Sequence, residues 1–196
     1  MGQLTSNISS CFQPEAKTIT ILGGGSPGKT TILYKLVADG PDDIIPTVGF
    51  NRESLLFENQ WLHFWDIGGG SKMPQLWPHH VREADGVIYV IDCSDEEYFE
   101  YGLSELVQLI DRTSDMELIP FLIFANKQDK PDLIASSRIN DKLLEVKCRY
   151  QWHLQPCSAT TGQGLSEGIK IFNRNDQPKP VKIFRNLLTF KALLMS

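Results

Sequence analysis

The segment from residue 23 to residue 30 constrains the fold more than any other part of the chain. It reads GGGSPGKT and matches the pattern G-x-x-x-x-G-K-[ST], which forms a phosphate-binding loop only when a strand precedes it and a helix follows it. Both neighbours are predicted here, because residues 18–22 (TITIL) are strand-like and residues 29–37 (KTTILYKLV) carry apolar side chains at helical spacing. The sequence therefore predicts a strand, a phosphate-binding loop and a helix in succession.

The residues of this loop have separate predicted roles. Small residues allow backbone N–H groups to surround phosphate oxygens, and the helix N-terminus adds partial positive charge. Lys29 is expected to reach the β and γ phosphates of a nucleotide, and the Thr30 hydroxyl to bind magnesium. Pro27 has no N–H, so we expect one phosphate hydrogen bond fewer and weakened binding. The predicted phosphate-binding residues are Gly23, Gly24, Gly25, Ser26, Pro27, Gly28, Lys29, Thr30 and Thr31.

Apolar runs and amphipathic segments alternate along the rest of the chain. The runs at residues 86–91 and 120–125 are nearly continuous, as expected for central strands covered on both faces. Ser94 and Glu97 form a capping-box pattern before a helix. Strands alternating with helices predict an α/β fold with a mainly parallel six-stranded sheet, flanked by helices and containing one antiparallel hairpin. The predicted strands are 18–22, 51–57, 61–65, 86–91, 120–125 and 150–154, and the predicted helices 29–37, 95–112 and 137–146.

A second motif, NKQD, directly follows a predicted strand, at the end where ligands bind in open α/β sheets. The Asp129 carboxylate can accept hydrogen bonds from both the ring N–H and the amino group of guanine, whereas adenine has no matching ring donor. This pairing selects guanine, because the wrong base would leave the carboxylate unpaired. Asn126 is expected to tie this loop to the phosphate loop, and the Lys127 stem to lie along the base. A further segment resembles the third base-contacting loop of guanine-binding sites, in which a backbone N–H contacts the guanine oxygen. It consists of Ser158, Ala159 and Thr160.

Two segments between these motifs carry further candidate ligands. Thr47, within the sequence PTVGF, offers a hydroxyl to complete the magnesium shell. Asp66, at the end of a predicted strand, offers a carboxylate suited to magnesium through water. The glycines after Asp66 allow a backbone N–H, at Gly69, to approach a γ-phosphate. In switch proteins, such segments change conformation when the γ-phosphate is lost.

Four segments together resemble the ADP-ribosylation factor (Arf/Arl) family, over residues 17–169. A tryptophan directly before Asp-x-Gly-Gly separates Arf-type chains from Ras-type ones. The resemblance implies a P-loop NTPase with a Ras-like G domain: a monomer that binds GTP or GDP with Mg²⁺, hydrolyses GTP and recruits effectors at membranes in vesicle traffic. It also implies a guanine-nucleotide exchange factor and a GTPase-activating protein as partners. The segments are 28–36 (GKTTILYKL), 45–51 (IPTVGFN), 65–69 (WDIGG) and 125–129 (ANKQD).

Three aromatic residues resemble the triad with which the family contacts effectors and exchange factors: Phe50, Trp65 and Trp77. Plain core packing is the alternative for each of them. An exposed aromatic cluster beside the switch segments would favour the partner surface.

The chain departs from the family pattern in three places. The family's catalytic glutamine follows the two switch glycines, and Gly70 stands there in this chain. Glutamine orients the attacking water and glycine cannot, so we expect very slow hydrolysis and a poor response to an activating protein. Gly25 replaces the family's usual aspartate, which affects the interplay with exchange factors. Residues 170–196 are interrupted by prolines and do not resemble the usual final helix.

The N-terminal segment, residues 1–16, has the sequence features of a membrane anchor. After removal of Met1, the sequence GQLTS matches the myristoylation pattern, with Gly2 as the acceptor. One acyl chain binds membranes only marginally, and apolar residues of this segment fall on one helical face. Together with the resemblance to the Arf/Arl family, this segment implies a cytoplasmic protein that is peripherally associated with the Golgi or another endomembrane. An ordinary N-terminal tail is the alternative for the segment.

Composition excludes several other classes of function. The net charge of −5 argues against a nucleic-acid binder, and the four cysteines lack zinc spacing and read as cytosolic thiols. No apolar run approaches the ~20 residues of a spanning helix.

Two hypotheses about function stay open: a slow GTPase switch, and a catalytically impaired, GTP-retaining scaffold or binding module. A P-loop ATPase or kinase is disfavoured by NKQD and the switch residues.

Overall fold

The computed structural model describes residues 16–37, 47, 49–70, 73–114, 119–146, 148 and 150–172. Its strands are β1 (Lys17–Leu22), β2 (Phe50–Phe57), β3 (Gln60–Ile67), β4 (Gly86–Asp92), β5 (Phe121–Asn126) and β6 (Trp152–Pro156). Its α-helices are α1 (Lys29–Val37), α2 (Trp77–Arg82), α3 (Glu96–Arg112), α4 (Ser137–Glu145) and α5 (Leu165–Ile169), with the 3₁₀ turns η1 (Met73–Gln75) and η2 (Lys170–Phe172).

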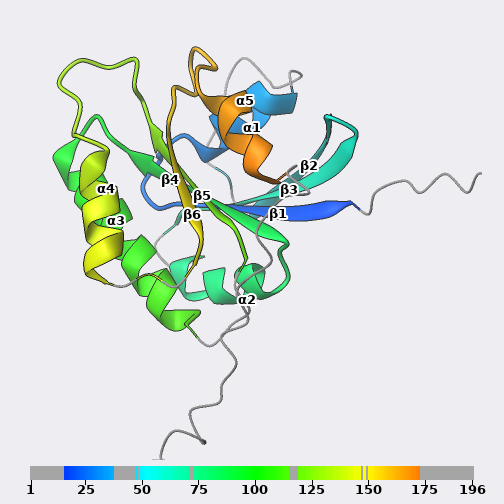
Figure 1. The fold of residues 1–196 in the computed structure, drawn as a ribbon, viewed down its shortest axis with the longest axis horizontal. Helices are drawn as coiled ribbons and strands as arrows, with labels where there is room; N and C mark the ends of the chain where they lie inside the picture. The colour runs from blue at the N-terminus through cyan, green and yellow to red at the C-terminus, as the bar shows by residue number, and fades with distance from the viewer. Residues whose placement is uncertain are drawn as a thin grey trace, which may run out of the picture.

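The strands form one six-stranded sheet in the order β2-β3-β1-β4-β5-β6. The β2–β3 pair is antiparallel and the other four pairs are parallel. Helices cover both faces (Figure 1), with α1 and α5 on one face and α2, α3 and α4 on the other. Every residue of β4 and β5 is consequently buried, which explains their nearly continuous apolar sequences. The predicted α/β fold is confirmed.

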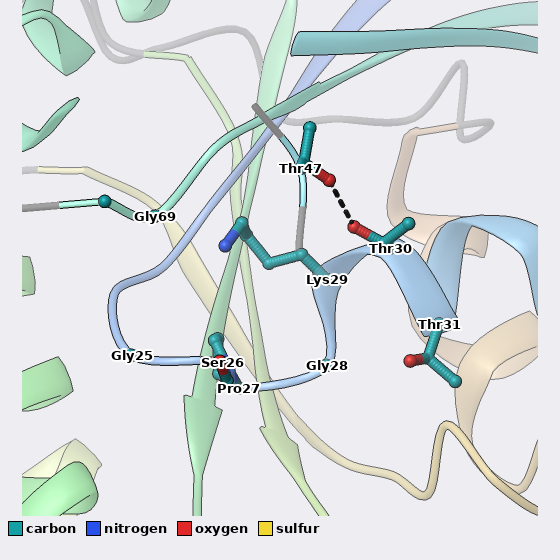
Figure 2. A pocket seen from close by; sticks show the side chains of 10 residues that line it. Gly25, Ser26, Pro27, Gly28, Lys29, Thr30, Thr31, Thr47 and Gly69 are labelled. Carbon is teal, nitrogen blue, oxygen red and sulfur yellow. Dashed lines mark hydrogen bonds between the residues drawn. The ribbon is translucent and has the colours of Figure 1, made fainter. Parts of the chain in front are cut away.

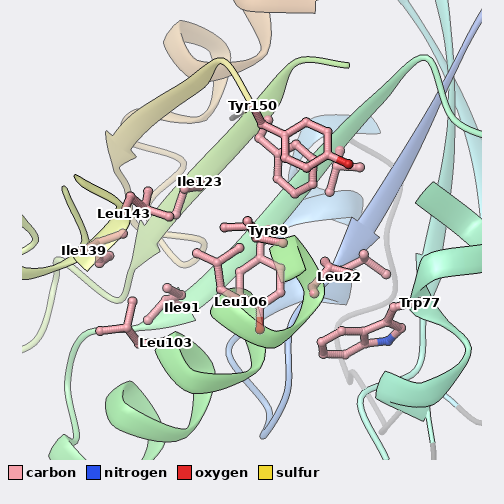
Figure 3. Packing of buried hydrophobic residues seen from close by; sticks show 14 of the residues in the cluster. Leu22, Trp77, Tyr89, Ile91, Leu103, Leu106, Ile123, Ile139, Leu143 and Tyr150 are labelled. Carbon is pink, nitrogen blue, oxygen red and sulfur yellow. The ribbon is translucent and has the colours of Figure 1, made fainter. Parts of the chain in front are cut away.

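Tyr89 of β4 lies at the centre of the core that joins the sheet to α2 and α3 (Figure 3). Its hydroxyl donates a hydrogen bond of 2.9 Å to the carbonyl of Gly102 in α3, and burial raises the pKa of this phenol well above its ordinary value. The Trp77 ring of α2 packs edge-on against Tyr89, with ring centroids 5.8 Å apart. These two contacts hold α2 and α3 in place against β4.

Helix α3 begins one residue later than the predicted capping box requires. The Asp95 side chain caps the helix by accepting hydrogen bonds from the backbone N–H groups of Glu97 (2.9 Å) and Tyr98 (3.1 Å). The Ser94 hydroxyl instead donates to Asp92 Oδ1, at 2.7 Å. The capping box predicted at Ser94 was therefore wrong, because a buried carboxylate competes for that hydroxyl.

The substitution Asp95→Ala should lower the free energy of unfolding by about 1 kcal/mol, because it removes the acceptor for two N–H groups of the first helical turn. Urea unfolding of the purified protein measures this change. Ser104→Ala, on the exposed face of the same helix, is the matched control and should be nearly neutral. Equal effects of the two substitutions would contradict the assignment of the cap.

The last residues that the structure describes form the turn η2, which packs against the core. Ile169 and Phe172 are buried in the cluster that joins the sheet to α1 and α5, and the Lys17 amine donates a hydrogen bond of 2.5 Å to the Phe172 carbonyl. The core thus extends beyond residue 169. The predictions for Gly2, for most of the N-terminal segment and for residues 173–196 lie outside the described residues. Among the helices that are described, none is long and apolar enough to cross a membrane.

Candidate nucleotide-binding site

A cavity of about 420 Å³ lies where the phosphate loop leads from β1 into α1 (Figure 2). It is lined by residues of the loop, of the first turn of α1 and of both predicted switch segments. Gly23 and Gly24 precede these residues in the loop and are buried. The lining residues are Gly25, Ser26, Pro27, Gly28, Lys29, Thr30, Thr31, Thr47, Gly69 and Gly70.

The backbone of the loop has the shape of an anion-binding concavity. Gly25, Ser26 and Gly28 have positive φ angles of 68°, 47° and 98°. Left-handed residues among right-handed ones turn backbone N–H groups toward a common centre. At Gly28 close packing also requires glycine, because a Cβ atom would lie 2.5 Å from the side-chain nitrogen of Asn126.

Lys29 lies under this loop, at the start of α1. It is buried, and its amine donates a hydrogen bond of 2.7 Å to the Gly23 carbonyl across the loop. Burial lowers the pKa of the amine, and attraction to the Asp66 carboxylate opposes that shift. A phosphate group in the loop would favour the charged amine, so the position suits the predicted role of Lys29.

Thr30, Thr47 and Asp66 converge beside the loop. The two hydroxyl oxygens lie 2.9 Å apart, and both hydroxyls donate to Asp66 Oδ2, Thr47 at 3.3 Å. Burial raises the pKa of the Asp66 carboxyl, and the Thr30 hydrogen bond and the charge of Lys29 oppose that shift. Asp66 Oδ1 is buried without a hydrogen-bond partner among the described residues. Oxygen donors of this kind suit Mg²⁺, so the residues fit the predicted ion.

Asn126, at the end of β5, joins three loops. Its side-chain nitrogen donates a hydrogen bond of 2.7 Å to the Pro27 carbonyl in the phosphate loop. Its side-chain oxygen accepts one of 2.9 Å from the backbone N–H of Ala159. The predicted link between the NKQD motif and the phosphate loop is confirmed, and it extends to the loop at residues 158–160.

The Asp129 carboxylate is exposed and is held by the same third loop. The Ser158 hydroxyl donates a hydrogen bond of 2.6 Å to Asp129 Oδ1. This hydrogen bond is the main reason that the pKa of the carboxyl lies below its ordinary value, so Asp129 is ionised at neutral pH. Its other oxygen can accept from a base. Thr160, the last residue predicted for this loop, is exposed.

Lys127 has a partner that the sequence reasoning missed. Its amine forms an ion pair with the carboxylate of Asp92, which is only 2% exposed. Asp92 also accepts hydrogen bonds from the backbone N–H (2.9 Å) and the hydroxyl (2.7 Å) of Ser94. Asp92 thus positions the lysine stem that is predicted to lie along the base. The sequence signal that could have indicated this partner of Lys127 was the carboxylate that directly follows the apolar run of β4.

The two predicted switch segments contact each other next to the cavity. The Gly68 backbone N–H donates a hydrogen bond of 2.8 Å to the Gly49 carbonyl. The Gly69 backbone lies close to Lys29, since a Cβ atom on Gly69 would be 2.9 Å from the lysine amine. Gly70 is exposed, and a Cβ atom there would meet nothing within 4 Å among the described residues. Packing therefore does not require glycine at position 70.

The three aromatic residues of the predicted partner surface separate into two groups. The Phe50 side chain is 59% exposed, and the centroid of its ring lies 5.1 Å from that of Trp65. The Arg52 guanidinium lies over the Trp65 ring, 5.4 Å from the ring centroid. Trp77 is only 1% exposed. Its assignment to the partner surface was wrong, because it fills the core beside Tyr89.

The fold and the site together define a small GTPase with a P-loop and a Ras-like G domain. A sequence model of the ADP-ribosylation factor family matches residues 4–175, and the chain belongs to that family. It is also similar to the solved structure of the Arl6 BBS3 small GTPase from Trypanosoma brucei with a bound nucleotide analogue, GppNp. The two are 25% identical, the match covers 81% of this chain and 96% of that chain, and the TM-score is 0.71.

Membership of this family makes the chain a guanine-nucleotide-binding switch in general terms. Small GTPases of the family bind GTP and GDP with Mg²⁺ and hydrolyse GTP. They act together with exchange factors, activating proteins and effectors.

Proposed function

We propose that this chain is an Arf-type switch with unusually slow GTP hydrolysis, which recruits effectors at membranes in vesicle traffic. The observation that carries the slow rate is the exposed Gly70, beside Gly69 in the lining of the cavity. Lys29 and the loop N–H groups are assigned to the phosphates. A glutamine side chain that orients water is missing at position 70, so the bound GTP would persist.

The same geometry supports a switching motion. Thr47 and Gly69 lie in the two segments that line the cavity, and the Gly68–Gly49 hydrogen bond ties these segments together. Thr30, Thr47 and Asp66 would hold Mg²⁺, which when bound neutralises phosphate charge. Because Thr47 and Gly69 are assigned to the ion and the γ-phosphate, loss of that phosphate would release both segments together.

A GTP-retaining binding module is the second candidate, and Gly70 favours it as well. Single-turnover hydrolysis of bound GTP, with and without an Arf-type activating protein, separates the two. Turnover within minutes under activation would support a working switch. GTP that stays intact for many hours under both conditions would support the retaining module. Turnover at ordinary Arf rates would contradict the proposal that Gly70 slows hydrolysis.

Removal of magnesium should accelerate nucleotide release. We expect excess EDTA to raise the GDP dissociation rate by on the order of tenfold or more, because the phosphates lose their main counter-charge. Stopped-flow fluorescence of a labelled GDP measures this rate. In the Asp66→Asn variant, release should already be fast in magnesium and respond little to EDTA. A normal EDTA response in that variant would exclude Asp66 from the metal site.

The proposal places the chain in the cytoplasm, peripherally attached to the Golgi or another endomembrane through an acylated Gly2. We expect Gly2→Ala to lose most binding to vesicles in a flotation assay with protein from cells, because the acyl acceptor is removed. Mass spectrometry of the same protein reads the modification directly. Gln3→Ala keeps the acceptor and serves as the control. An unmodified Gly2, or equal flotation of both variants, would remove the anchor.

The proposed partner surface is the exposed Phe50 ring with Trp65 and Arg52. A tilted aromatic pair with a guanidinium packed over one ring is the kind of residue cluster that dominates protein interfaces. It lies on β2 and β3, next to the segments that carry Thr47 and Gly69, so a partner there would contact the nucleotide-dependent part of the protein. We assign this surface to exchange factors and effectors, and propose a monomer that does not bind nucleic acid.

A further inference from the structure

Tyr98 and Tyr101 of α3 lie against the phosphate loop and have no role in the function proposed above. They are three residues apart and therefore share one face of the helix. Both are large side chains that stay partly in water, at 50% and 39% exposure. Each ring thus has one side on the protein and one side in solvent.

The two rings occupy the space into which side chains at Gly24 and Gly25 would extend. A Cβ atom on Gly24 would collide with Cε1 of Tyr101. A Cβ atom on Gly25 would lie 3.1 Å from Cδ1 of Tyr98, which is tighter than ordinary van der Waals contact. Three successive glycines give this loop little packing of its own and a high conformational entropy when free. The tyrosine rings supply the packing atoms that the loop lacks.

The first turns of α3, which carry the two rings, are themselves held by contacts with α4 and by a helix cap. Arg138 of α4 pairs with Glu96 at 2.8 Å and also with Glu100. Its guanidinium lies 4.9 Å from the centroid of the buried Phe99 ring. The Asp95 cap fixes the start of the same turn.

We propose that Tyr98 and Tyr101 are positioning residues that form a side wall of the phosphate loop. The wall restrains Gly24 and Gly25 so that the following loop N–H groups point into the cavity, and in this way it slows the release of bound nucleotide. The inference rests on the nucleotide site described above, and it adds two residues of α3 that touch the loop and are not among the residues that line the cavity.

The test uses the full chain loaded with a fluorescent GDP in magnesium, and measures release into excess unlabelled GDP. The double variant Tyr98→Ala/Tyr101→Ala should release GDP roughly tenfold faster, because the loop loses the packing contacts of both rings. The Tyr98→Phe/Tyr101→Phe variant keeps both rings and should release it at the wild-type rate. Leu144→Ala removes a 65% exposed apolar side chain from α4 and should leave release unchanged.

A second-site experiment separates the ring contact from a general loss of stability. Gly24→Ala alone should accelerate release, because the new methyl group must displace the Tyr101 ring. In the Tyr101→Ala background the methyl group has space, so Gly24→Ala should add no further acceleration. Equal effects of Gly24→Ala in both backgrounds, or release from the double alanine variant at the wild-type rate, would overturn the inference. If the wild-type chain retains no guanine nucleotide at all, the nucleotide site itself is overturned.

Discussion

Replacement of Gly70 by glutamine should raise the rate of GTP hydrolysis, in the presence of an Arf-type activating protein, by on the order of a hundredfold. A side-chain amide at this position would orient the attacking water beside the γ-phosphate. The structure can accept it, because Gly70 is exposed and a Cβ atom there meets no described residue within 4 Å. The gain should appear in the single-turnover rate and leave GDP affinity nearly unchanged.

The control for this experiment is Gly70→Leu, which adds a side chain of similar size without an amide. It should hydrolyse GTP as slowly as the wild type, measured as phosphate released from preloaded protein. If Gly70→Leu is as fast as Gly70→Gln, the added side chain acts through the conformation of the loop. If the wild type already matches Gly70→Gln, another group positions the water and the argument from Gly70 fails.

The substitution Asp129→Asn should lower GDP affinity by about a thousandfold, because two charge-assisted hydrogen bonds to guanine, each ~1.5–3 kcal/mol, are lost or reversed. The amide donates where the amino group of guanine also donates. Xanthine carries an oxygen at that position and can accept from the amide. We therefore expect the variant to bind xanthosine diphosphate better than GDP, by calorimetry with both nucleotides.

Asp132→Asn is the matched control, since Asp132 is an exposed carboxylate shortly after the NKQD motif and has no predicted contact with the base. It should bind GDP like the wild type. Ser158→Ala should have a smaller effect than Asp129→Asn, because it removes only the 2.6 Å hydrogen bond that holds the carboxylate. GDP affinity that survives in Asp129→Asn would mean that the base is recognised elsewhere.

Segments with strong local signals were predicted well from the sequence. The apolar runs of β4 and β5 and the GGGSPGKT loop between a strand and a helix all lie where expected. The link from Asn126 to the phosphate loop is also confirmed. In each case the signal depends on residues that are neighbours in the sequence, so short-range patterns contain the information.

The predictions that failed depend on contacts that the motif and periodicity patterns do not specify. Trp77 was assigned to a surface, and its burial against Tyr89 follows from the packing of α2 on β4. The cap of α3 moved from Ser94 to Asp95 because the Ser94 hydroxyl binds Asp92. Asp92 lies only two residues before Ser94, but the capping-box pattern does not include it. The residues next to Trp77 in the sequence do not indicate Tyr89 as its packing neighbour.

The position of Asn126 has a consequence for nucleotide exchange. One side chain binds both the phosphate loop, at Pro27, and the loop next to the base site, at Ala159. The loop that contacts the base and the loop that contacts the phosphates are therefore both held by the same side chain. An exchange factor would not need to loosen both ends of the nucleotide separately. Displacement of either loop would strain the Asn126 contacts and weaken the hold on the opposite end as well.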